Sequence, residues 1–134
     1  MAKISTSACK AKGRRLQDSV REQLLKLHPS LEEDDIKCAI MGESGTDIKL
    51  SPAARKLIPF SIECKNQEKI NIWGSISQCE ANAKGTQIPL LIFKRNRTKT
   101  YACIEFDQLL QIITQTSKIP DNSGTGIEKS DSNT

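Results

Sequence analysis

Two carboxylates and a lysine in this chain are spaced as metal-assisted hydrolysis would require. Asp47 lies sixteen positions before Glu63, and Glu63-Cys64-Lys65 ends the alternating run Pro59–Lys65. A strand there would place Glu63 and Lys65 side by side on one face, with the apolar set facing a core. Two carboxylates supply the oxygen ligands of a hard divalent cation, and the lysine could orient or help deprotonate the attacking water.

The hydrophobic pattern predicts the elements that must position these residues, in the order helix, three strands, helix, two strands, helix. Helices show apolar residues at helical spacing, and strands show alternating or continuous apolar runs. The first two predicted helices cover residues 12–27 and 71–83. A third is predicted after Asp107, which would cap it, with an apolar stripe of Leu109, Leu110 and Ile113. The predicted strands cover residues 36–41, a segment between 41 and 59, and residues 59–65, 88–93 and 100–106.

The order of an Asp followed by Glu-x-Lys on the next strand resembles the PD-(D/E)xK nuclease superfamily. Thr46 stands where that superfamily usually has proline. The resemblance covers roughly residues 10–115 and implies an α/β fold with a restriction-endonuclease-like αβββαβ core, in which helices flank a central mixed sheet. It also implies an Mg²⁺-dependent endodeoxyribonuclease, with Mn²⁺ able to substitute. Asp47, Glu63 and the Cys64 carbonyl would bind the metal, and Lys65 would orient the water.

The first helix is similar to that of archaeal-type Holliday-junction resolvases and related phage endonucleases. Those proteins have a Lys-Gly pair and then a metal-site Glu four residues after the glycine, a position that Gln17 occupies here. An amide can bind a metal-bound water or a phosphate, but it brings no charge to the cation. Asp18 and Glu22 are nearby acids that could replace the missing Glu, but the turn of the helix would point their side chains in directions different from that of Gln17.

Gln78 on the second long helix lies near the place where several nucleases of the superfamily carry a polar residue after the catalytic strand. That resemblance suggests contact with a metal-bound water or a phosphate. A surface glutamine is the alternative.

Two basic clusters predict contact with a polyanion. The net charge of +4 is moderate, but cations crowd the N-terminal segment and a later hairpin, whereas acids concentrate at residues 32–35. Phosphate contacts supply most of the sequence-independent affinity for DNA and make it salt-sensitive. The expected DNA-binding residues are Lys10, Lys12, Arg14, Arg15, Lys94, Arg95 and Arg97.

Length and composition predict one domain over residues 10–116, a flexible N-terminus at 1–9 and a disordered tail at 117–134. Neither a membrane span nor a signal peptide is indicated, so we expect a soluble, cytoplasmic protein, in the host cell if a phage encodes it. Five cysteines without a C-x-x-C pair, and a lone His28, indicate neither a disulfide framework nor a zinc site. A Cys-His nucleophile is a minor alternative.

The resemblance favours a structure-selective enzyme that acts as a homodimer, because the two strands of a junction must be cut together. The strand at residues 88–93, Trp73 or the last helix could supply the dimer contact. Two alternatives remain: a site-specific endonuclease of the restriction or homing type on the same core, and a non-catalytic nucleic-acid-binding module. Little chain is spare for reading bases, apart from residues 51–57 and the tail, and Gln17 is the best argument for the module.

Overall fold

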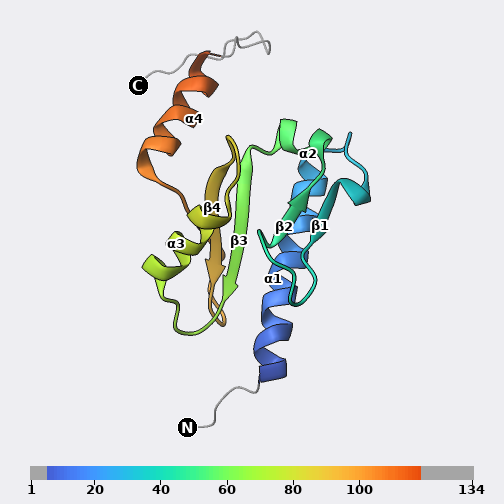
Figure 1. Cartoon of the computed structure of the whole chain (residues 1–134), viewed down its shortest axis with the longest axis vertical. Helices are drawn as coiled ribbons and strands as arrows, with labels where there is room; N and C mark the ends of the chain where they lie inside the picture. Colours follow the sequence, from blue (N-terminus) through green and yellow to red (C-terminus); the bar gives the residue numbers. More distant parts are fainter. Residues whose placement is uncertain (1–5, 119–134) are drawn as a thin grey trace. The chain divides into compact units, whose positions relative to one another are not determined.

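The computed structural model describes residues 6–118, which form α-helices, a short 3₁₀ helix and five strands (Figure 1). In chain order these are α1 (Thr6–Leu27), η1 (Glu33–Asp35), β1 (Ile36–Cys38), β2 (Ile48–Leu50), α2 (Pro52–Leu57), β3 (Phe60–Asn66), α3 (Ile72–Asn82), β4 (Ile88–Lys94), β5 (Tyr101–Cys103) and α4 (Phe106–Lys118). Of the predicted flexible termini, residues 1–5 and 119–134 lie outside the described part. Within that part, no helix is long and apolar enough to cross a membrane.

The strands form two sheets, and the α/β class is confirmed. β1 and β2 make an antiparallel pair, whereas β3, β4 and β5 form a mixed sheet in that order, parallel between β3 and β4 and antiparallel between β4 and β5. The predicted single central sheet is therefore reproduced only in part. A backbone hydrogen bond of 3.1 Å, from the Asp47 amide to the Ile62 carbonyl, connects the two sheets.

The first strand is shorter than predicted because the chain turns away after Cys38. Gly42 and Gly45 adopt φ angles of 84° and 93°, which are left-handed values that glycine tolerates best. Ile40 and Met41, predicted to belong to the strand, lie instead in this loop with 75% and 65% of their surface exposed. The amide of Ala39 donates to the Asp47 carbonyl over 2.8 Å, which closes the loop at its base.

The segment between Met41 and Pro59 holds the short strand β2 and a helix that the hydrophobic pattern did not reveal. Ser51 caps this helix, α2, by accepting from the Ala54 amide at 3.1 Å, and Pro52 occupies its first turn. Both signals are present in the sequence. Ala54 and Ile58 anchor α2 in the core.

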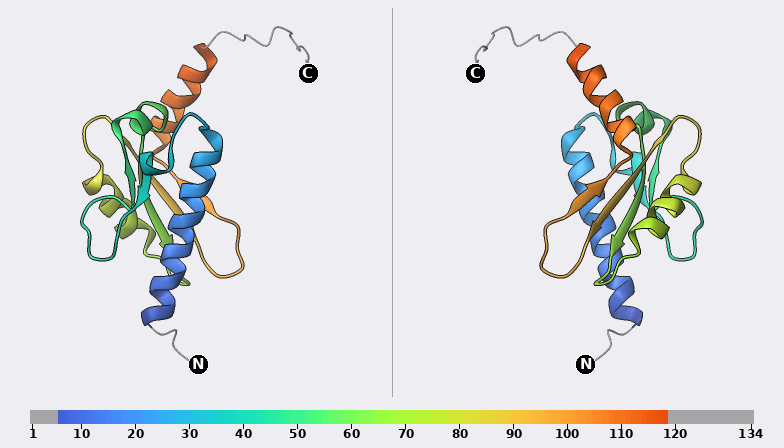
Figure 2. Two further views of the ribbon diagram at one scale, coloured as in Figure 1. Left: turned by 90° about the vertical axis from the view of Figure 1, so that its right-hand side faces the viewer. Right: turned by 90° about the vertical axis from the view of Figure 1, so that its left-hand side faces the viewer.

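Helices cover both faces of β3, so its burial does not follow the alternation of its sequence. Ile62 and Cys64 belong to the core that α1, β1, β2 and α2 share, together with Leu16 and Ile36. The other face packs against α3, where the Cys79 thiol donates to the Ser61 carbonyl over 3.7 Å. Figures 1 and 2 show α1 and α3 on opposite sides of the sheet. Residues 61–64 are consequently all buried.

α4 belongs to a second unit of the chain, which begins at Glu105. The helix begins at Phe106, so the predicted strand at 100–106 is confined to Tyr101–Cys103. Asp107 lies in the first turn of α4 rather than at the cap. A carboxylate in that turn is still favourable, because the helix dipole is positive there.

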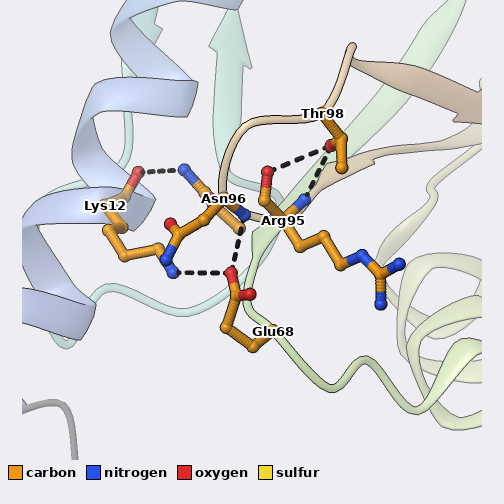
Figure 3. Close-up of polar contacts among 6 residues, drawn as sticks. Lys12, Glu68, Arg95, Asn96 and Thr98 are labelled. Carbon is orange, nitrogen blue, oxygen red and sulfur yellow. Dashed lines mark hydrogen bonds and ion pairs between the residues drawn. The ribbon is translucent and has the colours of Figure 1, made fainter.

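Lys12 and Glu68 tie α1 to the turn between β4 and β5 (Figure 3). The Lys12 Nζ lies 3.3 Å from Glu68 Oε2, which also accepts from the Asn96 amide at 2.6 Å. The Lys12 carbonyl in turn accepts from the Asn66 side chain at 3.1 Å. Lys12 is only 7% exposed, so this predicted DNA contact is a buried bridge between elements.

We therefore expect Lys12→Ala to lower the free energy of unfolding, by about 1 kcal/mol or more, because it removes both the buried aliphatic stem and the partner of Glu68. Lys10→Ala is the matched control, since Lys10 lies exposed on the same helix. It should change stability by less than about 0.5 kcal/mol. Urea unfolding measures both, and equal effects would contradict the bridging role.

Candidate metal centre

Two hydrogen bonds hold Asp47 against the edge of β3, and a third joins it to the end of β1. Its amide donates to the Ile62 carbonyl over 3.1 Å, and its carbonyl accepts from the Ala39 amide at 2.8 Å. Its Oδ2 accepts from the Cys64 amide at 2.7 Å. The side chain therefore has a fixed position beside β3.

Glu63 extends from β3 toward α3 and is almost fully buried, with 2% of its surface exposed. The Asn82 amide donates to Glu63 Oε2 over 3.0 Å. Burial, followed by the charge of Asp47, raises the pKa of Glu63 to about 7, while Asn82 and the charge of Lys65 oppose this rise. Asp47 and Glu63 thus lie close enough to share a proton, as Asp47 also contributes a side-chain hydrogen bond.

This pair of carboxylates suits a hard divalent cation. Two neighbouring acids in a buried site repel each other, and a cation between them would remove that repulsion. The amide and carbonyl of a strand residue point in the same direction, so the Cys64 carbonyl also faces Asp47. Within residues 6–118, no group of three or more His, Cys, Asp or Glu side chains could hold a metal. The remaining ligands would be a carbonyl, waters or a phosphate, which is the usual environment of Mg²⁺.

Lys65 follows Glu63 by two residues on β3, so both side chains leave the same face. It is partly buried, and its ammonium is near enough to lower the pKa of Glu63. A lysine in this position could hold a water molecule beside the cation.

A cavity of about 480 Å³ opens next to Asp47, between α1 and the loop after β1. Gln17 and Asp18 both line it, whereas Glu22 does not. Asp18 also accepts from the Cys38 thiol at 3.6 Å. Burial and then the charge of Asp18 raise the pKa of that thiol to about 11. Gln17 and Asp18 are thus the α1 residues placed to reach a cation or phosphate near Asp47.

Asn82 was missed by the sequence reasoning, which selected Gln78 on the same helix. Gln78 is exposed, whereas Asn82, one turn later on the same face, contacts Glu63. The sequence does show that Gln78 and Asn82 are four residues apart and therefore share a face of the helix. Choosing Asn82 over Gln78 would have required knowing how α3 packs against β3.

The basic residues of the two clusters lie in different environments. Lys10 and Arg14 line the cavity beside Asp47, and Lys12 pairs with Glu68. Arg15 is exposed outside this lining. In the second cluster Lys94 is partly buried, and Arg95 and Arg97 are exposed in the turn between β4 and β5.

A comparison with protein-family models matches residues 9–132 to a family described as "Phage putative PDDEXK endonuclease". No curated protein and no solved structure matches the chain significantly. The matched range contains every candidate residue of the site.

The raised pKa of Glu63 should make the metal-free protein less stable as pH rises. The folded state holds this proton more tightly than the unfolded chain, with a pKa of about 7 against 4.5. The stabilisation is therefore complete below pH 4.5 and is lost as pH rises through 7, by roughly 1–3 kcal/mol. Urea unfolding in EDTA at several pH values measures this loss. Glu63→Gln should flatten the profile, and an unchanged slope would contradict the assignment.

Asn82→Ala should raise the pKa of Glu63 further, because it removes a hydrogen bond that favours the ionised carboxylate. Gln78→Ala is the matched control, an amide removed from the same helix one turn earlier, and should leave that pKa unchanged. Carbon-detected NMR titration of the Glu63 carboxyl measures both variants. A shift in Gln78→Ala alone would restore Gln78 as the contact residue.

Proposed function

The chain belongs to the family of phage PDDEXK endonucleases, and from this premise we propose that it is an Mg²⁺-dependent endodeoxyribonuclease selective for branched DNA. The observation that carries the proposal is the convergence of Asp47 and Glu63 at β3, with Lys65 next on the same face. Asp47, Glu63 and the Cys64 carbonyl would hold Mg²⁺, for which Mn²⁺ could substitute. When bound, such a cation polarises a phosphate oxygen and lowers the pKa of a bound water.

The side chains of this site would have separate tasks. Lys65 would hold the attacking water, and Asn82 would keep Glu63 ionised and oriented. Lys10 and Arg14 would bind phosphates at the mouth of the cavity beside Asp47. Gln17 or Asp18 would contact a metal-bound water or the phosphate from α1. All of these groups stabilise charge on the phosphate rather than recognise bases.

Selectivity for DNA structure is supported by the short connections between the elements of residues 6–118. The longest loop within residues 6–118 joins β1 to β2 and spans positions 39–47. The hydrogen bond between Ala39 and Asp47 closes its base. Sequence is read mostly by elements that enter a groove and contact base edges. A site-specific endonuclease would need such an element, so we rank it second.

We further propose that the enzyme acts as a homodimer. β4 lies between β3 and β5, so this strand is unsuited to a contact between subunits. Trp73, 80% exposed on α3, and the apolar residues of α4 are better candidates, because Leu110 and Ile113 are also exposed. Analytical ultracentrifugation of the Trp73→Ser and Ile113→Ser variants would distinguish the two surfaces.

Asp47→Asn and Glu63→Gln should each reduce DNA cleavage below detection while leaving binding intact. Asn at position 47 can still accept the hydrogen bond of the Cys64 amide, so the fold should survive, as circular dichroism can verify. Lys65→Ala should lose roughly 10²–10⁴-fold in rate, as expected for a group positioned for proton transfer. Near-normal cleavage by either carboxylate variant would eliminate this metal centre.

The enzyme should bind and cut branched DNA, including four-way junctions, faster than matched linear duplex in the presence of Mg²⁺. Affinity should fall steeply as salt rises, and the slope should decrease when Arg14 and Arg15, or Arg95 and Arg97, become alanine. Lys12→Ala should leave the slope nearly unchanged, because its charge is already paired. Cleavage of linear duplex at one defined sequence would instead establish the site-specific alternative.

A further inference from the structure

The sheet face that carries Glu63 and Lys65 continues into a row of aromatic side chains. The register pairs Lys65 with Phe93 and Phe93 with Tyr101, so the three residues lie side by side across β3, β4 and β5. Directly paired residues point to the same face of a sheet. The rings of Phe93 and Tyr101 lie 6.2 Å apart between centroids and are tilted by 34°.

These rings form part of a cavity of about 390 Å³ at the carboxyl ends of β3 and β4. Ile70 and Ile72 supply further apolar surface, and the other lining residues are polar. The polar lining consists of Gln67, Glu68, Lys94, Arg95 and Thr98. Apolar walls with a few polar groups and this volume are typical of a small-ligand site.

The rim of the cavity is held in place before any ligand arrives. Figure 3 shows the turn from Arg95 to Thr98, in which the Arg95 amide donates to Thr98 Oγ1 over 3.1 Å. The Asn96 amide donates to Glu68, whose charge Lys12 also neutralises in part. Lys94 and Arg95 therefore leave the rim positive on balance. A pre-formed site loses little conformational entropy on binding.

The cavity is close to the candidate metal centre. Phe93 is displaced from Glu63 by two residues along the strand and by one strand across the sheet, which corresponds to about 8 Å between Cα atoms at ordinary sheet spacing. A nucleotide joined to a phosphate at the metal centre could reach this distance. Aromatic walls beside a basic rim fit a base with its attached phosphate.

We propose that this aromatic cavity binds an unpaired nucleobase of the nucleotide next to the cleaved phosphate. The base would stack on Tyr101 and Phe93, and Arg95 would bind the adjoining phosphate. A paired base would first have to leave the helix, which costs free energy. The enzyme would therefore favour branched substrates with unpaired nucleotides at the branch, such as flaps. This inference rests on the proposed nuclease function.

The test measures binding without cleavage, by fluorescence anisotropy in EDTA, of a short single-stranded oligonucleotide and of the corresponding duplex. Tyr101→Ala should weaken single-strand binding by roughly 5- to 100-fold, the range expected for loss of one base stack, and leave duplex binding nearly unchanged. Tyr101→Phe should bind like the wild type. Leu27→Ala is the control, because Leu27 is an exposed apolar residue of α1 outside the cavity lining.

An oligonucleotide series with one abasic position supplies a second readout. When the abasic position is the one whose base occupies the cavity, the wild type should bind the oligonucleotide more weakly. Tyr101→Ala should then bind that oligonucleotide as tightly as the wild type does. Equal losses on single strand and duplex, or no loss in Tyr101→Ala, would overturn the proposal. These results are independent of the metal centre: cleavage by Asp47→Asn would refute the nuclease site and leave the base-binding measurement standing.

Discussion

The candidate site depends on the way Asp47 connects the two sheets. Its backbone bonds to β3 and to the end of β1, and its carboxylate caps the Cys64 amide. The strand pair β1–β2 thus reaches β3 through the same residue that would bind the cation. A shift of β2 along β3 would break these bonds and also separate Asp47 from Glu63. The geometry of the site and the junction between the two sheets therefore depend on the same residue.

Burial of Glu63 opposes stability unless its charge is compensated. A nearly dry carboxylate beside a second acid favours its protonated form, and Asn82 and Lys65 offset this only in part. A divalent cation would complete the compensation, so metal affinity and local stability would be coupled. This arrangement concentrates the electrostatic cost of folding at the place where a cation would bind.

Local chemistry in the sequence predicted the order of the main elements and the α/β class, because alternation, helical spacing and caps act over a few residues. Gly42 and Gly45 end the first strand early, and Phe106 begins the last helix before Asp107. The pairing of Lys12 with Glu68 joins residues 56 positions apart, so no local pattern could show it. Asn82 was missed for the same reason. The spacing of Glu63 and Lys65 placed both on one face, but only tertiary structure brings Asp47 to that edge.

The Lys12–Glu68 contact also fixes the separation of the two basic surfaces. α1 carries Lys10 and Arg14 beside the Asp47 cavity, and the turn after β4 carries Arg95 and Arg97. Glu68 holds both elements, since it binds Lys12 of α1 and the Asn96 amide of the turn (Figure 3). Cations at a fixed separation match phosphates at one spacing and direction better than others, whatever the bases between them. A frame of this kind would support the proposed selectivity for branched DNA, because the path of the backbone differs between a branch point and a straight duplex.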